Sequence, residues 1–576
     1  MRGHDGSGDG SVARVRAGWS RRDFLRRTGQ TGAVGLFSGG LSGFLSACGS
    51  SSPPAQKAVV AGGTFTESGV TSAGFNPIVN TTTTDRLISC HLFDPLIGND
   101  AVGNALPMLA QDLPEISDDG LTWTFKLRDG VKWTDGKPLT SEDVVFTYRL
   151  MFDPDYKDVE SSFRGNLSTY LKSIEAPDAT TVVMQLSEPY APFLLGHCTH
   201  GILPKHVLGD LAAKEINTAD FNSNPTVSNG AFKFVEWVKD DHVVLARNPD
   251  YYRGAPQLEK YIFRTYPPGA AMLNALKTGE LNGGKVTAPA DFEQLQSVPE
   301  LTTYTYPDNG ITNFFYQLDP SKSAGGKIFA DVAVRQALVW ALDREGMAKG
   351  IYRGFGGDVA DSFFASVSWA FNKDVSPKYG FDPAKASQLL TEAGWVKNGK
   401  GILEKNGQPM KFVITAPVNA SQYVQCAQTM ESNWKDIGVD VSVKLIQYAE
   451  LLNVAYFTRE FDVIIPGYAF LPDPDPSITF HSRNIIPGAS NAASYKNPQV
   501  DKLLDDAVAT NDQDERKQLY FQIGDILATD LPSVPLVRTR GQFAFDKQFD
   551  GISDKTIGTF TNFVLRPFAN KIGKKA

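Results

Sequence analysis

A short segment after a predicted strand carries the side chains best suited to hold a charged ligand. The strand is residues 461–468, and it leads into two aromatic rings and two carboxylates, Tyr468, Phe470, Asp473 and Asp475. Largely parallel sheets bind ligands beyond the carboxyl ends of their strands. A carboxylate at such a place, closed off from water, would pair with a cation such as an amine. The same residues also fit a rigid Pro-Asp loop whose acids are solvated.

Other reactive residue types form no recognisable catalytic or metal-binding pattern. His197, Cys198 and His200 lie close in sequence, but no CxxC pair or Cys/His zinc spacing accompanies them. The sequence contains no GxSxG, HExxH or GxxxxGK[ST] motif. We therefore predict a chain that is not an enzyme, with no catalytic residue, no metal site and no cofactor.

Length and charge narrow the class further. A chain of 576 residues is too long for one hydrophobic core, so two or three domains are expected. The formal net charge is −8 although residues 1–47 are basic, so the rest is acidic and unsuited to nucleic acid. Apart from Cys48, three cysteines remain, Cys90, Cys198 and Cys426, which allow at most one internal disulfide.

The N-terminus has the features of an export signal. Ser20 is followed by the pair Arg21 and Arg22 and then by Phe24-Leu25, which matches the twin-arginine pattern. The apolar stretch 31–47 is too short for a stable membrane span and ends in Leu45-Ser46-Ala47-Cys48, a lipobox. We predict a lipoprotein anchored through Cys48 on the outer face of the cytoplasmic membrane. The alternative is a signal peptide cut without lipidation.

The elements that would position the ligand segment alternate between strand and helix. We predict strands at 410–415, 439–446 and 461–468, with a helix at 421–437 between the first two. This order is typical of an α/β domain with a largely parallel sheet. Further helices are predicted at 329–347, capped by Asp331, and after Thr140, where Asp143 completes a capping-box spacing.

Three segments resemble one known family. They are LRDGVKWTDGKPLTSEDVVFTY at 127–148, NGAFKFVEW at 229–237 and VRQALVWALDR at 334–344. All three resemble the solute-binding proteins of ABC importers that handle peptides and nickel, family 5, and the similarity extends over about residues 60–570.

The resemblance implies an α/β fold of the periplasmic-binding-protein type (type II, cluster C-like), with two lobes built from three domains joined by a hinge. The expected parts are a twin-arginine-type lipoprotein signal peptide at 1–47, the lipidated Cys and a flexible tether at 48–60, domain I at 61–98, 228–308 and 536–576, domain II at 99–227, and domain III at 309–535.

The implied function is capture of di- or oligopeptides between the lobes by a monomer, and delivery to a membrane permease driven by its ATPase. Thr83, Asn313 and Phe314 would lie near the cleft. The alignment puts either Pro472 or Asp473 in the place of the family's amine-binding acid. Nickel or its chelate, an oligosaccharide and an opine remain open as ligands. A secreted hydrolase or a peptide-sensing lipoprotein is the alternative of another class.

Overall fold

The structure is a computed structural model that describes residues 59–60, 62–69, 72–79, 83–161, 163–267, 269–561 and 568–575. The predicted signal peptide with Arg21 and Arg22, the lipidation site Cys48 and most of the tether lie outside these ranges. The described residues belong to one compact unit. No helix in the described ranges is long and apolar enough to cross a bilayer.

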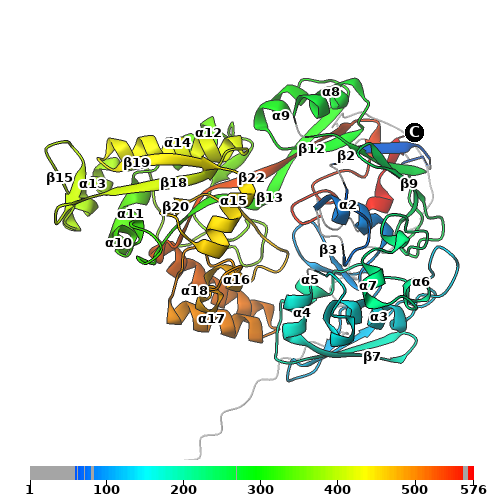
Figure 1. Cartoon of the computed structure of the whole chain (residues 1–576). Helices are drawn as coiled ribbons and strands as arrows, with labels where there is room; N and C mark the ends of the chain where they lie inside the picture. Colours follow the sequence, from blue (N-terminus) through cyan, green and yellow to red (C-terminus); the bar gives the residue numbers. More distant parts are fainter. Residues whose placement is uncertain are drawn as a thin grey trace, which may run out of the picture. The chain divides into compact units, whose positions relative to one another are not determined.

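A twelve-stranded mixed sheet runs through this unit (Figure 1). Its main path runs in the order β19 (Asp440–Ile446), β18 (Lys411–Pro417), β20 (Val463–Ile464), β13 (Leu301–Tyr316), β22 (Ser533–Asp546), β12 (Gly283–Val286), β2 (Thr64–Gly69), β11 (Lys260–Thr265), β10 (His242–Arg247) and β9 (Phe232–Val238). Off this path, β14 (Gly357–Val359) pairs with β22, and β21 (Tyr468–Ala469) pairs with β13.

The two longest strands, β13 and β22, lie at the centre and belong to both halves of the sheet. They pair antiparallel over most of their length, and the register shifts between Pro307 and Ile311. The predicted domain limits at 308/309 and 535/536 fall inside these strands. The two halves are therefore joined by continuous, hydrogen-bonded strands.

Beyond β13 on the β19 side, the predicted strand-helix-strand order is present. β18 is parallel to both β19 and β20, and α14 (Ser421–Asp436) connects β18 to β19. The predicted strand 461–468 is interrupted, because only β20 and the short β21 are extended and Pro466-Gly467 lies between them. The predicted helix 329–347 is also wrong as one element. It is α11 (Val332–Trp340) and α12 (Arg344–Gly350), since Asp343 caps a new helix.

Both faces of this half of the sheet are covered by helices. One core joins Phe314, Ile414 and Trp434 with α11, α12, α14, α10 (Gly325–Phe329) and α13 (Pro383–Glu392). The other joins Phe315 and Ile464 with α15 (Tyr448–Asn453), α16 (Ser477–Phe480), α17 (Pro498–Ala509) and α18 (Gln513–Asp530). Because alternate side chains of β13 enter opposite cores, its last three residues, Phe314, Phe315 and Tyr316, are all apolar and buried.

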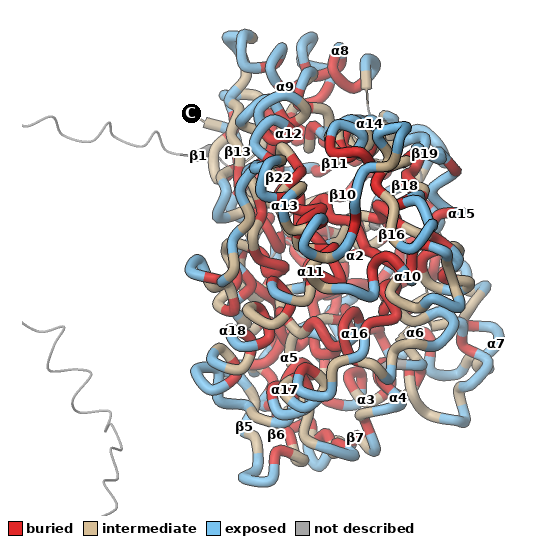
Figure 2. Tube along the Cα trace, turned by 90° about the vertical axis from the view of Figure 1, so that its left-hand side faces the viewer, coloured by how far each residue is buried: buried red, intermediate tan, exposed pale blue. Residues whose placement is uncertain are grey.

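On the β9 side, one large core spans the end of the sheet and a smaller domain. It packs α2 (Thr83–Leu92) against the sheet, where the ring of His91 lies 4.8 Å from that of Tyr261. The smaller domain is an antiparallel sheet of β5 (Glu115–Ile116), β6 (Thr122–Lys126), β8 (Thr181–Leu186) and β7 (Leu171–Asp178). Figure 2 shows the buried residues inside these layers and the exposed ones on outer turns.

The helix predicted after Thr140 is α3 (Ser141–Phe152), which packs on this smaller sheet. The Asp143 carboxylate accepts a hydrogen bond from the Thr140 backbone N–H at 2.9 Å, so the capping-box prediction is confirmed. It also accepts from the Lys205 N–H at 2.9 Å and thereby ties a second segment to the helix start.

The remaining helical elements are α4 (Arg164–Tyr170), α5 (Phe193–His197), α6 (Lys205–Leu208), α7 (Ala213–Ile216), α8 (Ala270–Thr278) and α9 (Pro289–Leu295), with a π-helical turn at Val454–Thr458 and 3₁₀ turns at Pro154–Tyr156, Asp220–Asn222, Ser482–Asn484 and Ala569–Lys571. The remaining strands are β1 (Val59–Val60), β3 (Ile97–Asn99), β4 (Ala105–Pro107), β15 (Val396–Lys397), β16 (Leu403–Lys405), β17 (Gln408–Pro409), β23 (Phe549–Asp550) and β24 (Gly573–Lys575).

Candidate functional site

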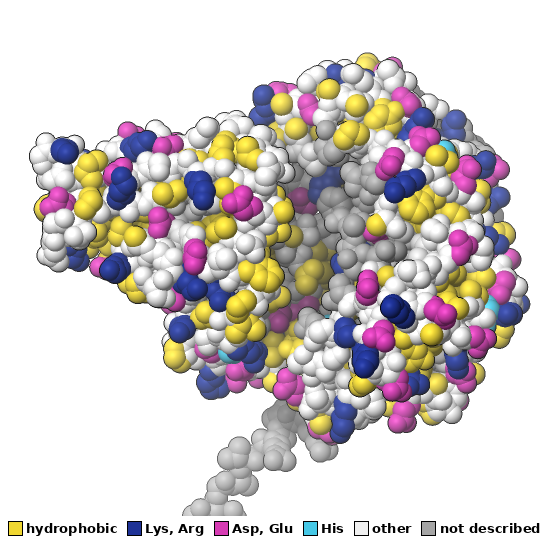
Figure 3. Space-filling model, viewed as in Figure 1, with side chains coloured by type: hydrophobic (Ala, Val, Ile, Leu, Met, Phe, Trp, Pro, Cys, Tyr) yellow, Lys and Arg dark blue, Asp and Glu magenta, His cyan; other side chains and the backbone are white. Residues whose placement is uncertain are grey.

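Two cavities meet where β13 crosses between the halves of the sheet, and Asn309 lines both of them. The larger one, here named the tyrosine chamber after Tyr352, Tyr423, Tyr448 and Tyr468, has a volume of about 470 Å³. The other, here named the arginine chamber after Arg86, has a volume of about 300 Å³. Figure 3 shows a hollow between the two halves in this region of the molecule.

The interruption of the β13–β22 ladder creates the contact between the chambers. Pro307 has no N–H to donate, and regular pairing resumes only at Ile311. In between, Asn309 pairs with the loop after β21. Its carbonyl accepts from the Phe470 N–H at 2.6 Å, and its side-chain amide donates to the Phe470 carbonyl at 3.1 Å. β13 and this loop therefore form one continuous wall.

The tyrosine chamber holds charges of both signs. Lys285 Nζ lies 3.1 Å from Asp308 Oδ2, and both side chains are about five-sixths buried. Burial lowers the pKa of Lys285, and Asp308 opposes this shift. Arg540 reaches in from β22, with Nη1 3.3 Å from the Asp358 carboxylate and Nη2 3.2 Å from Thr305 Oγ1. One carboxylate and two cations thus border the same space.

The tyrosines of this chamber act as neutral hydrogen-bonding groups. Burial raises the pKa of Tyr352 and Tyr423 above the usual range of a phenol, so both stay protonated at neutral pH. The Tyr423 hydroxyl lies where a side chain at position 467 would begin, and Gly467 has φ +71°. Glycine is therefore required at the turn that brings Tyr468 to the chamber.

The arginine chamber is bounded by α2 on one side and by the segment 195–201 on another. Arg86, Ser89 and Cys90 recur at helical spacing on α2, and His197 and His200 face them from the second segment. Burial lowers the pKa of His197 to about 4 and that of His200 to about 3. Both imidazoles are therefore neutral at pH 7. The loop residues Phe470, Leu471 and Pro472 form a third side.

The two carboxylates singled out from the sequence line neither chamber. Asp473 is engaged with Arg516, whose Nη1 and Nη2 donate to its two oxygens at 2.9 and 2.8 Å, and both side chains are about nine-tenths buried. Asp475 accepts from the Ser477 N–H at 2.9 Å and from its hydroxyl at 2.5 Å. Burial and the neighbouring Asp473 raise the pKa of Asp475. Their role toward a ligand stays a prediction.

The other predicted residues divide into two groups. Tyr468 lines the tyrosine chamber and Phe470 the arginine chamber, so the segment after β20 does reach the cleft. Asn313 and Phe314 are fully buried in the core beside β22, where the Asn313 amide donates to Ser533 Oγ at 2.8 Å. Thr83 begins α2, and its side chain lies outside the described residues.

The sequence reasoning missed the charged residues that line the chambers, Arg86, Lys285, Asp308 and Arg540. One signal was available, because the turn-forming run Pro307-Asp308-Asn309-Gly310 precedes a strand-like run without a helix or a long loop. It marks a break inside a strand. The described residues contain no group of three His, Cys, Asp or Glu side chains placed to hold a metal ion.

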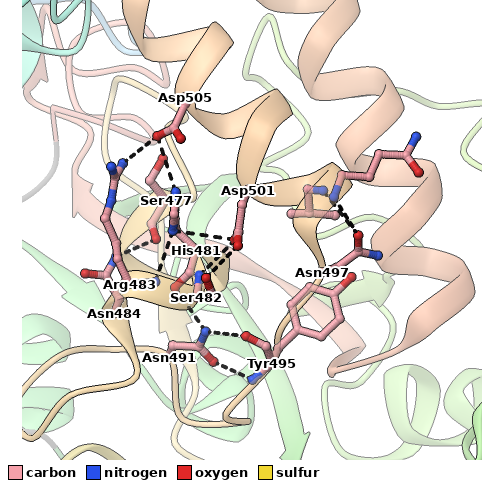
Figure 4. A network of polar contacts seen from close by, with 12 residues as sticks. Ser477, His481, Ser482, Arg483, Asn484, Asn491, Tyr495, Asn497, Asp501 and Asp505 are labelled. Atoms are coloured by element: carbon pink, nitrogen blue, oxygen red, sulfur yellow. Dashed lines mark hydrogen bonds and ion pairs between the residues drawn. The ribbon is translucent and has the colours of Figure 1, made fainter.

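A polar network holds residues 477–484 in place, the segment that follows the loop in contact with Asn309 (Figure 4). Ser482 donates to the Asp501 carboxylate from its N–H at 2.9 Å and from its hydroxyl at 2.5 Å. His481 lies between Asp501 and Asp505, with nitrogen-to-oxygen distances of 3.5 and 3.3 Å. These contacts join α16 and the turn after it to α17, so the chamber wall is anchored on the α17–α18 pair.

Comparisons with known proteins find close relatives. Residues 104–484 match the family described as "Bacterial extracellular solute-binding proteins, family 5 Middle". The oligopeptide-binding protein AppA of Bacillus subtilis is 31% identical over 521 residues, which cover 88% of this chain and 93% of AppA. The structure of AppA in complex with a nonapeptide has a TM-score of 0.72 at 28% identity and covers 90% of this chain and 100% of that one.

A second solved structure, NikZ from Campylobacter jejuni in complex with Ni(L-His), has a TM-score of 0.72 at 26% identity and covers 89% of this chain and 99% of that one. The predicted α/β fold of the periplasmic-binding-protein type is confirmed by these matches.

The two neutral histidines predict a loss of stability in acid. Because their folded pKa values lie below the ordinary 6.5, the unfolded chain binds more protons between pH 6.5 and about 4, and folding weakens as the pH falls through that window. His200→Gln should reduce the loss of unfolding free energy between pH 6.5 and 4 by about 3 kcal/mol, measured by urea denaturation at each pH.

Asp94 provides a control of opposite sign. Burial raises its pKa to about 6, so it favours the folded state as the pH falls below 6, and Asp94→Asn should steepen the acid loss. An unchanged pH profile in His200→Gln would contradict the assignment of a neutral, buried His200.

Proposed function

Since this chain belongs to the bacterial extracellular solute-binding proteins, family 5, we propose that it captures peptides in its two chambers and delivers them to the permease of an ABC importer. Proteins of this family are binding components of transporters, so the chain is a binding protein and not an enzyme. The relative AppA is named for oligopeptides, and its structure holds a nonapeptide.

The observation that carries the peptide proposal is the composition of the tyrosine chamber. A peptide brings an amine, a carboxylate and a row of backbone amides. The chamber offers the Asp308 carboxylate, the cations of Lys285 and Arg540, and the amide side chains of Gln422 and Gln542. The Gln542 side-chain oxygen is buried and has no hydrogen-bond partner among the described residues, so it is available to a ligand N–H.

The ligand would act by joining the two halves. Arg540 and Lys285 lie on β22 and β12, whereas Tyr423 and Tyr448 belong to the half that contains α14 and α15. A ligand that contacts both sets at once favours the closed arrangement about β13 and β22. The closed form is what a permease would recognise.

Asp308 is the carboxylate best placed for the peptide amine, because it lines the tyrosine chamber, whereas Asp473 lines neither chamber. N-acetylation of a peptide should weaken binding to the wild type by roughly 10- to 100-fold, the cost of losing a hydrogen bond to a charged group. It should weaken binding to Asp308→Asn hardly at all. Calorimetry with free and acetylated peptides measures both effects.

Asp473→Asn is the matched variant. It should keep the acetylation penalty of the wild type, but lose on the order of 3 kcal/mol of unfolding free energy, because Arg516 is left buried without its partner. If the penalty instead disappears in Asp473→Asn and persists in Asp308→Asn, the carboxylate predicted from the sequence is the amine partner. Capture of Ni(L-His), an oligosaccharide or an opine without any peptide would exclude the peptide proposal.

We also propose that the protein is exported and anchored by lipid at Cys48, on the strength of the twin-arginine and lipobox residues. Mature protein should begin at Cys48 with acyl chains attached and partition into detergent. Cys48→Ala should accumulate as precursor or appear in the aqueous phase. Mass spectrometry of the N-terminus checks this, and an exported wild-type protein with residues upstream of Ser46 still attached would contradict it.

A further inference from the structure

The arginine chamber carries a charge that none of its described lining residues neutralises. Among the described residues that line it, Arg86 is the one with a formal charge, and no Asp or Glu is present. This distinguishes the chamber from the tyrosine chamber, where Lys285 lies 3.1 Å from Asp308 and Arg540 lies 3.3 Å from Asp358, so each cation has a carboxylate partner. A ligand group in the arginine chamber therefore meets an uncompensated cation.

Arg86 is held in place by packing. Its guanidinium carbon lies 5.2 Å from the ring centroid of Phe163, and its Nε is buried with no hydrogen-bond partner in the described part of the chain. Burial lowers the pKa of Arg86, and no carboxylate in the described ranges offsets this shift. A partly dehydrated cation with an unsatisfied donor is stabilised by an anion that accepts from it.

Two buried histidines add further unsatisfied groups on the same side. His197 is 4% exposed and His200 is 8% exposed, and both line the chamber. Within the described ranges, His197 Nδ1 and His200 Nε2 have no hydrogen-bond partner. The ring of His200 lies 4.0 Å from that of Phe163, so Arg86 and His200 contact the same phenyl ring. Buried nitrogens without partners are rare in native proteins and point to a ligand or ion that satisfies them.

The opposite wall offers nothing to a cation. Phe470, Leu471 and Pro472 present apolar groups, and the acid that follows them, Asp473, is bound to Arg516. The chamber therefore favours a negatively charged group over a positively charged one. It has donors and a positive charge on one side and an apolar surface on the other.

We propose that the arginine chamber is an anion subsite that receives a carboxylate of the ligand, with Arg86 as its charge partner. The identification of the ligand as a peptide rests on the proposed function, whereas the sign of the subsite does not. Because Asn309 borders both chambers, a peptide with its amine beside Asp308 would extend past Asn309 and place an acidic group near Arg86. The carboxylate is either the C-terminus of the peptide or an acidic side chain.

Capture from a random tetrapeptide library tests the subsite. The library is offered as an equal mixture of free acids and C-terminal amides, and bound peptides are identified by mass spectrometry. The wild type should show one of two patterns, each of roughly 10- to 100-fold. It should enrich free acids over amides, or it should enrich amides that carry Asp or Glu over amides that carry neither. The first pattern assigns the C-terminus and the second an acidic side chain.

Variants assign the preference to Arg86. Arg86→Gln should capture acids and amides alike, and Arg86→Lys, which keeps the charge, should retain part of the preference. Arg264→Gln is the control, since Arg264 lies in a half-exposed ion pair with Glu280 at 3.3 Å and lines neither chamber. It should behave as the wild type. Equal capture of acids and amides by the wild type, with no enrichment of Asp or Glu, would overturn the subsite and leave peptide binding intact.

If no peptide is captured, a second probe tests whether the arginine chamber binds an anion. Citrate should then raise the melting temperature of the wild type and of Arg86→Lys above that in sodium chloride of equal ionic strength, and should not do so for Arg86→Gln. That result would support an anion subsite in a protein whose ligand is not a peptide. An equal response of wild type and Arg86→Gln to citrate would reject the subsite together with the peptide proposal.

Discussion

The antiparallel pairing of β13 with β22 is the constraint on which the rest of the site depends. Both strands continue from one half of the sheet into the other, so each half is fixed to the other by a hydrogen-bonded ladder and not by a loose linker. Such a ladder resists sliding, and it bends most easily where its register is broken. The break lies at 307–311, next to Asn309, which borders both chambers. On the proposed function, bending of the sheet and contact with the ligand would therefore occur at the same point of the fold.

What the sequence predicted correctly was local. The cap of α3 by Thr140 and Asp143 involves residues three positions apart. The pattern that predicts each of β18, α14 and β19 likewise lies within that element. Patterns of this length are visible because the interacting groups are neighbours in the chain. The same reasoning failed for the helix 329–347, since Asp343 favours a new cap as strongly as the apolar pattern favours continuation.

The charged groups of the site could not be predicted in this way. Lys285, Asp308 and Arg540 come from β12, β13 and β22, and only the pairing of those strands brings them to one chamber. The case of Asp473 shows the reverse error. It follows a strand and precedes a proline, as a ligand carboxylate could, but a partner 43 residues away, Arg516 on α18, takes up both of its oxygens. Sequence alone does not show which carboxylate is already neutralised.

The difference in charge between the chambers also bears on when the halves close. Closure removes water, which strengthens every electrostatic interaction inside and raises the cost of a charge without a partner. Lys285 and Asp308 lie 3.1 Å apart and neutralise each other without a ligand, so removing water from around them costs less than it does for a lone charge. Arg86 has no such carboxylate among the described residues that line its chamber, so closing over an empty arginine chamber would bury a lone cation. On the proposed assignment, a ligand carboxylate removes that penalty only in the closed state, which is the differential interaction that a ligand needs in order to shift the population toward closure.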